Sequence, residues 1–325
     1  MRKARMKPAF LFRIADAVFL ARPLLWIPVW GYCAFGYFSG LSAMHGFHLT
    51  AAWKTPFAAA AWMLVFSCSV GAVYVVNQVA DRQVDVINAG LPLLAKGNIS
   101  LRLAWATAII LALASLLVPL AGRPAVSLFS AMALAIGLIY CIRPFYFSGR
   151  FVLDFLTNAA GFACIAFGAG WYLSGAAFGV TFLVSSAPYF LLMCAGSISS
   201  TLPDIEGDRK CGKKTTAVTM GLQSAHILAS SFIVAGLAVS LILHDWIALT
   251  CAGLALPFYS AYLIRKTAGI MESTYKIGGL IMMLAAAAVF PYLIVASLLS
   301  LFATIAYFRL RFHVWYPSLV PADKK

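Results

Sequence analysis

Long apolar runs separated by short polar segments dominate the chain of 325 residues. Each run holds about 20 mostly apolar residues, the length of α-helix that crosses the hydrocarbon core of a bilayer. The pattern predicts nine spans near residues 17–40, 57–77, 102–121, 124–142, 151–173, 177–200, 223–243, 245–264 and 280–308. The ninth run is long enough to be strongly tilted or broken by Pro291. We therefore expect an all-α, polytopic integral membrane protein of about nine transmembrane helices.

Composition excludes a soluble protein. Hydrophobic residues make up 63% of the chain and charged residues only 10%, whereas soluble domains carry roughly 25% charged residues. No polar segment is long enough for a separate soluble domain, so residues 1–325 are predicted to form a single membrane domain. The basic, then apolar, N-terminal region has no clear small-residue cleavage site and is interpreted as a retained first span.

Basic residues predict the orientation in the membrane. If the N-terminus is cytoplasmic, the inner connections hold Arg2, Lys3, Arg5, Lys7, Arg13, Arg82, Lys96, Arg102, Arg143, Arg150, Arg209, Lys210, Lys213, Lys214, Arg265, Lys266 and Lys276. The outer connections hold only Lys54 and Arg123. This asymmetry favours a cytoplasmic N-terminus. Nine spans would nevertheless leave the basic tail, with Arg309 and Arg311, outside, so either the tail is tolerated there or one span is miscounted.

The formal net charge of +14 could suggest a nucleic-acid partner. The cations lie instead along the predicted cytoplasmic rim, where anionic lipid headgroups attract basic residues. Membrane lipids and a phosphate-bearing substrate are therefore the expected partners, and no nucleic acid is expected. The pattern predicts no oligomeric state.

Two short acidic segments carry the strongest clue to chemistry. Asp81 and Asp85 in the first, and Asp204 and Asp208 in the second, are each four residues apart, so each pair shares one face if the segment is helical. Asn77 extends the first stripe by one turn. Mg²⁺ prefers oxygen ligands and binds through one or two carboxylates plus substrate phosphates. These five side chains are the predicted metal ligands; the alternative is that they are solvated acids at the ends of spans.

The paired motifs resemble those of the UbiA superfamily of intramembrane prenyltransferases. Further similar segments are Ala21-Arg22-Pro23 with Trp26, Gly97-x-Ile99-Ser100, Pro203 to Lys210, and Gly212 with Thr215-Thr216. Two positions depart from the family pattern. Gln78 stands where the family often has Asp, and Tyr140 is followed by Arg143 where the family tends to carry a Lys.

The resemblance implies a helical bundle around a cavity open to the cytoplasmic side and the membrane. It also implies Mg²⁺-assisted ionisation of an allylic diphosphate, followed by attack of a lipid-soluble acceptor on the prenyl cation. An aromatic quinone-type precursor is the favoured acceptor; a tetrapyrrole, a glycerol phosphate ether and a sugar phosphate remain alternatives. The implied catalytic residues are Asp81, Asp85, Asp204, Asp208 and Arg143, the last because a guanidinium binds phosphate through two hydrogen bonds.

Several other polar residues are candidates for substrate binding, each with a structural alternative. They are Arg22, Tyr140, Lys96, Asp154, Asn158 and Arg209. Arg22 lies within a predicted span, where an ionisable group indicates function unless it reaches the interface. Asp154 and Asn158 could face the cavity, or serve as a helix cap or packing group.

A transporter or cation channel is the main competing interpretation, because rings of acidic residues also select ions. The acidic pairs are predicted at one membrane face, whereas the midplane lacks ionisable residues apart from Arg22. This distribution favours an enzyme. Intact acids in both motifs also disfavour a lipid-binding relative without catalytic activity.

Overall fold

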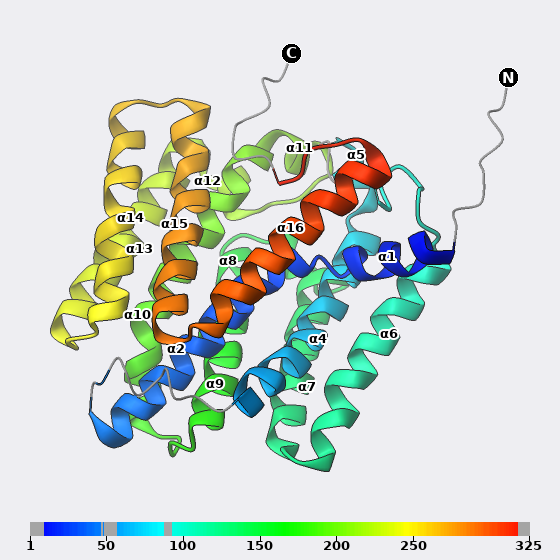
Figure 1. Ribbon diagram of the computed structural model, residues 1–325. Helices are drawn as coiled ribbons and strands as arrows, with labels where there is room; N and C mark the ends of the chain where they lie inside the picture. Colours follow the sequence, from blue (N-terminus) through cyan, green and yellow to red (C-terminus); the bar gives the residue numbers. More distant parts are fainter. Residues whose placement is uncertain (1–9, 47, 49–56, 88–92, 318–325) are drawn as a thin grey trace, which may run out of the picture.

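The computed structural model describes residues 10–46, 48, 57–87 and 93–317, and the regular elements of this part of the chain are all helical (Figure 1). The α-helices are α1 (Phe10–Leu20), α2 (Trp26–His45), α4 (Phe57–Ala80), α5 (Arg82–Ile87), α6 (Leu101–Leu117), α7 (Pro124–Cys141), α8 (Leu153–Ala159), α9 (Phe167–Ser174), α10 (Val180–Thr201), α11 (Ile205–Lys210), α12 (Thr216–Met220), α13 (Leu222–Ile242), α14 (Trp246–Ile264), α15 (Ala268–Val289) and α16 (Tyr292–Phe312). Shorter segments are the 3₁₀ turns η1 (Pro23–Leu25), η2 (Val118–Ala121), η3 (Phe147–Gly149) and η5 (Leu202–Asp204), and the π-helical segment η4 (Ala160–Ala166).

Within the described residues, nine helices are long and apolar enough to cross a membrane, as predicted. The predicted ninth span, 280–308, is wrong in its bounds. Pro291 ends the helical run, because proline cannot continue an α-helix without losing a backbone hydrogen bond, and α15 and α16 lie on either side of it. α15 begins at Ala268, and its first half carries the Glu272–Lys276 ion pair. These two charges lower the local hydropathy, so the hydrophobic pattern did not predict that the helix begins there.

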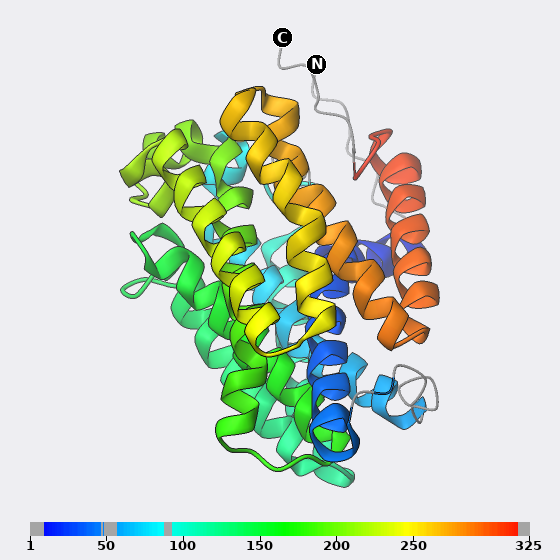
Figure 2. The ribbon, with the colours of Figure 1, turned by 90° about the vertical axis from the view of Figure 1, so that its left-hand side faces the viewer.

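α15, a helix of 22 residues, lies between the last two of the nine apolar helices in the chain. α14, α15 and α16 are successively antiparallel along the bundle (Figures 1 and 2). The C-terminal end of α16 therefore lies at the end of the bundle that holds α5 and α11. Arg309 and Arg311, in the last turn of α16, therefore lie at the same end as the acidic segments.

The predicted first span is also corrected, because it is broken in two. α1 ends at Leu20 and α2 begins at Trp26, and between them Arg22 adopts a left-handed conformation with φ 53°. The residue before a proline is disfavoured in the α region, and Pro23 follows. Arg22 therefore lies at a helix break and not within a helix. The Gln78 side chain fixes the break by donating a hydrogen bond to the carbonyl oxygen of Leu20 at 2.7 Å.

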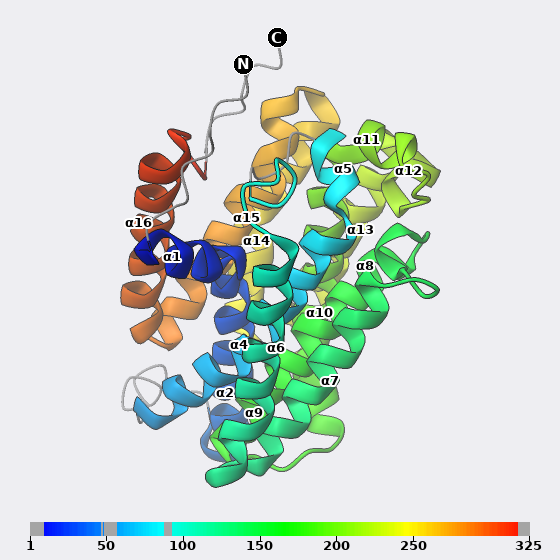
Figure 3. The same ribbon diagram turned by 90° about the vertical axis from the view of Figure 1, so that its right-hand side faces the viewer.

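α1 lies at the side of the bundle, transverse to the long helices, and packs against α16 (Figure 3). The buried carboxylate of Asp16 accepts hydrogen bonds from the hydroxyl of Tyr307 at 2.7 Å and from Nε of Arg311 at 3.2 Å. This contact joins the two ends of the described chain.

α2 and α9 form a close backbone contact at the centre of the bundle. A Cβ atom added at Gly36 would lie 1.9 Å from the carbonyl oxygen of Phe167, and one at Gly170 would lie 1.8 Å from that of Cys33. Small residues let membrane helices approach closely where packing, and not the hydrophobic effect, drives association. The contact fixes α2, and with it Arg22, relative to the helix pair α8–α9.

Candidate active site

The first acidic motif lies where α4 gives way to α5. Asn77 is in the last turn of α4, Asp81 lies between the two helices, and Asp85 is in α5. The amide of Asp81 donates to the carbonyl oxygen of Asn77 at 2.8 Å, and that of Asp85 donates to Asp81 at 2.9 Å. Because this helical hydrogen-bonding pattern continues across the junction, the three side chains share one face, as expected.

The second motif has the same relation to α10. Asp204 ends the turn η5 that follows this helix, and Asp208 lies in α11. α5 and α11 contact each other at one end of the bundle (Figure 1). The fold thus brings together two motifs that are more than 100 residues apart in the sequence.

Lys213 bridges the two motifs. Its Nζ lies 3.0 Å from Oδ2 of Asp81 and 3.7 Å from Oδ1 of Asp208, and the residue is only 9% exposed. Burial alone lowers the pKa of Lys213, but the carboxylates of Asp81 and Asp208 outweigh it, and the pKa is raised above its ordinary value. Lys213 is therefore charged across the neutral range, and it occupies the position of a cation between the two motifs.

Tyr146 is the second residue that contacts Asp81. Its hydroxyl donates a hydrogen bond to Oδ1 of Asp81 at 2.7 Å, and Nζ of Lys213 lies 5.6 Å from the centre of its ring. Burial and this hydrogen bond to Asp81 raise the pKa of Tyr146 to about 12. Gly149 leaves room for the ring, since a Cβ there would lie 2.7 Å from it. Tyr146 is therefore a protonated donor that orients Asp81.

Arg22 reaches the first motif from the break between α1 and α2. Its Nη2 lies 3.9 Å from Oδ2 of Asp85, and its buried Nε has no hydrogen-bond partner. Burial raises the pKa of Asp85, and the nearby charge of Arg22 partly opposes this shift. Asn77 donates from Nδ2 to Oδ2 of Asp81 at 3.3 Å. Arg22 therefore lies at the edge of the cluster, and its Nε is a buried donor without a hydrogen-bond partner.

The donor set of the two motifs fits Mg²⁺, because it consists of carboxylate and amide oxygens. Within the described residues, however, no three His, Cys, Asp or Glu side chains converge on a ready-made metal position. Lys213 occupies the space between Asp81 and Asp208. A metal held here would share its coordination shell with another oxygen ligand, as Mg²⁺ does when it binds a phosphate group.

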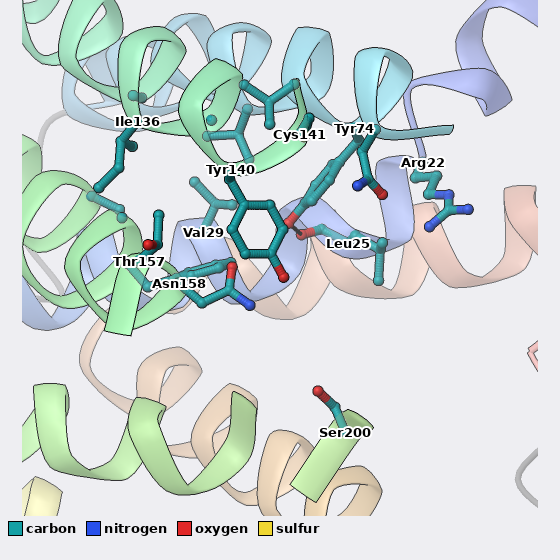
Figure 4. A pocket seen from close by; sticks show the side chains of 18 residues that line it. Arg22, Leu25, Val29, Tyr74, Ile136, Tyr140, Cys141, Thr157, Asn158 and Ser200 are labelled. Atoms are coloured by element: carbon teal, nitrogen blue, oxygen red, sulfur yellow. Dashed lines mark hydrogen bonds between the residues drawn. The ribbon is translucent and has the colours of Figure 1, made fainter. Parts of the chain in front are cut away.

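Two neighbouring cavities lie within the bundle, and the first of them adjoins the cluster. One, of about 440 Å³, is lined at its polar end by Arg22 and Asn77, and the other, of about 470 Å³, runs between α2, α10, α14 and α15. Residues that line both are Leu25, Tyr74, Asn158, Phe162 and Ser200. Figure 4 shows the side chains of Tyr140 and Asn158 close together, with Ser200 facing them across the open space. The cavities are mostly apolar and carry a few polar groups near the acidic motifs.

The predicted substrate-binding residues are only partly brought together. Arg22, Tyr140 and Asn158 line the first cavity. The buried carboxylate of Asp154 instead accepts hydrogen bonds from the backbone amide and the hydroxyl of Thr216, which ties α8 to α12. These hydrogen bonds are of the packing kind that was given as the alternative for Asp154.

Three predicted cations lie elsewhere. Lys96 and Arg209 are exposed and line neither cavity. Arg143 is also exposed, with its guanidinium 5.6 Å from the ring centre of Tyr146, and it lines separate surface pockets. Lys213, and not Arg143, is the basic residue between the aspartates.

These features define a polytopic membrane protein. Its two carboxylate motifs meet in a polar site at the mouth of an apolar cavity. The sequence model of the UbiA prenyltransferase family matches residues 35–276. The chain belongs to this family.

The chain spans about half the length of two plant relatives and 68% of an archaeal one. The chain is 30% identical over 192 residues to a probable homogentisate phytyltransferase 2 of Oryza sativa subsp. japonica, covering 54% of this chain and 50% of the relative. It is 28% identical over 190 residues to a 2-acylphloroglucinol 4-prenyltransferase of Humulus lupulus, covering 53% and 45%. It is 27% identical over 198 residues to the digeranylgeranylglyceryl phosphate synthase of Sulfolobus acidocaldarius, covering 59% and 68%.

Solved structures share the fold. A UbiA homolog from Archaeoglobus fulgidus, bound to GPP and Mg²⁺, superposes with a TM-score of 0.64 at 22% identity. The match covers 85% of this chain and 99% of that protein. At this identity the likeness concerns the fold alone.

Proposed function

We propose that this protein transfers a prenyl group from an allylic polyprenyl diphosphate to a lipid-soluble acceptor and releases diphosphate. The observation that carries the proposal is the joining of both acidic motifs through Lys213 at the mouth of an apolar cavity. Family membership supports it, as do relatives named as prenyltransferases and the GPP and Mg²⁺ bound to the Archaeoglobus protein.

In this mechanism, Asn77, Asp81, Asp85, Asp204 and Asp208 would hold Mg²⁺. When bound, Mg²⁺ neutralises charge on the departing diphosphate as a Lewis acid. The residues of the chain complete this environment. The Lys213 ammonium, which lies at Asp81 in the structure, would donate to diphosphate oxygens, and Tyr146 holds Asp81 in one orientation. Such charge-assisted hydrogen bonds are the strong ones.

The proposed transfer breaks one bond, forms one bond and releases one proton. The allylic C–O bond breaks with its electron pair leaving on diphosphate, the acceptor carbon forms the new bond to the prenyl carbon, and the acceptor loses one proton. The released diphosphate, held in the same cluster, is the base. The apolar walls around Phe162 and Leu25 exclude water from the allylic cation.

We favour an aromatic acceptor of the quinone-precursor type. Relatives named for homogentisate and acylphloroglucinol prenylation support this class. The Sulfolobus relative favours a glycerol phosphate ether as the second candidate. Tyr74, Tyr140, Asn158 and Ser200 supply the polar groups that would orient either acceptor in the cavity.

The test uses purified protein with geranyl or geranylgeranyl diphosphate. Diphosphate release should need Mg²⁺ and stop on addition of EDTA. A mass-resolved screen with homogentisate, an acylphloroglucinol and a prenylated glycerol phosphate then identifies the acceptor class. No release with any of these pairs, from protein that remains folded, would contradict the proposal.

We also propose that the acidic motifs face the cytoplasm. The proposal rests on the basic residues at that end of the bundle, to which the structure adds Arg309 and Arg311.

A further inference from the structure

Two neighbouring surface pockets lie beside the aspartate cluster, on the loop around residues 142–151. Their volumes are about 380 and 630 Å³, and both are lined by Arg143 and Tyr146. We call the pair the basic groove. It is distinct from the cavities inside the bundle, with which it shares only Cys141.

All charged residues that line the basic groove are basic. Arg143, Arg150, Lys210 and Lys214 line it and are exposed, and no acidic residue lines it. None of the four forms an ion pair with an acidic residue of the described chain. Four cations around one concave surface therefore attract an anionic ligand.

The other lining of the groove is apolar. Val76, Val79, Ile142 and Trp105 form a wall contributed by α4, α6 and the end of α7. In the loop beside the cations, Phe145 is 53% exposed and Phe151 is 47% exposed. Exposed aromatic side chains next to basic ones are typical of the membrane–water interface. The groove thus offers cations at the level of lipid headgroups and an apolar wall at the level of acyl chains.

We infer that the basic groove binds one anionic phospholipid. Its phosphate lies among Arg143, Arg150 and Lys214, and its acyl chains lie along the wall that includes Trp105. A free phosphate compound would satisfy the cations but leave the wall uncovered. The bound lipid contacts Tyr146, the residue whose hydroxyl holds Asp81, so the site lies one side chain from the aspartate cluster.

The first test measures retained lipid by native mass spectrometry. Protein is equilibrated with equal amounts of phosphatidylglycerol and phosphatidylcholine, and the two adducts are counted. Wild type should retain phosphatidylglycerol preferentially, and Arg150→Gln/Lys214→Gln should lower the preference by about fivefold per lost cation, since a basic residue near an anionic lipid surface contributes about 1 kcal/mol. Arg265→Gln/Lys266→Gln removes the same charge from exposed positions at another loop and should keep the preference.

Equal loss in the two double variants would show a diffuse effect of surface charge and would overturn the site. So would equal retention of the two lipids by wild type.

The second test uses Cys211, a free cysteine that lines the groove beside Lys210. Phosphatidylglycerol should slow its alkylation by N-ethylmaleimide, measured on the Cys211 peptide, whereas phosphatidylcholine should not. The protection should be lost in Arg150→Gln/Lys214→Gln. Equal protection by soluble glycerol phosphate would identify a site for phosphate compounds and not for a lipid, and would refute the inference, as would no protection at all. Neither test depends on the proposed transferase activity.

Discussion

Replacing Lys213 with Met should destabilise the protein most when metal is absent. The substitution keeps the length of the side chain and removes the ammonium that lies between Asp81 and Asp208. Two carboxylates at the ends of different helices would then face each other without the cation that bridges them.

The magnitude follows from the distances. With an effective dielectric constant of 20, the Coulomb attraction is about 5.5 kcal/mol at 3.0 Å and about 4.5 kcal/mol at 3.7 Å. Desolvation offsets much of this, and removing one partner of a buried pair costs about 3–5 kcal/mol. The side chains of Lys213 and Asp81 are 8% and 12% exposed, so solvent screens the pair little. We expect a loss of about 3 kcal/mol in EDTA.

The assay is thermal unfolding in detergent at one fixed heating rate, with EDTA or with Mg²⁺ alone. The ammonium of Lys213 competes with Mg²⁺ for Asp81 and Asp208, so Mg²⁺ should raise the unfolding midpoint more in Lys213→Met than in wild type. Lys214→Met is the matched control, because Lys214 is exposed. An unchanged midpoint in EDTA, or an equal loss in both conditions, would refute the reasoning.

Three further predictions concern the same site and its orientation. Asp81→Asn and Asp204→Asn should each lower turnover by several orders of magnitude with normal yield, because each removes a metal ligand; near wild-type rates of diphosphate release in both would contradict the metal assignment. Tyr146→Phe should slow turnover about tenfold through loss of one hydrogen bond to a charged group, about 1.5 kcal/mol, and an unchanged kcat would show that Asp81 needs no such orientation. With endogenous Cys211 removed, a cysteine near Gly212 should react with an impermeant thiol reagent only from the cytoplasmic side. A cysteine near Gly122 should react only from outside, and the opposite pattern would invert the topology.

Sequence alone predicted the helical class, the number of apolar spans and the pairing of the two motifs, because these depend on run length and on four-residue spacing. It missed the break at Arg22, although Pro23 signalled it, and it merged α15 with α16 because the charges of Glu272 and Lys276 lowered the local hydropathy.

The contacts of the site were harder to predict. Lys213 was one of many basic residues explained equally well by topology, and only the packing of α5 against α11 sets it between Asp81 and Asp208. Tyr146 carries no local signal, since its role depends on a hydrogen bond to a residue 65 positions away. Arg143, chosen for its place after Tyr140, is exposed and lines the surface pockets instead.

The contact between α1 and α16 has a consequence for the order of assembly. Asp16 and Tyr307 are 291 residues apart, and α16 follows every other described membrane helix. During synthesis the carboxylate of Asp16 must therefore wait for α16 before it gains these donors. α1 leads directly into the break that carries Arg22, so the position of Arg22 in the site depends on the contact between α1 and α16. A ribosome-bound chain that ends before Tyr292 should therefore still have a mobile α1.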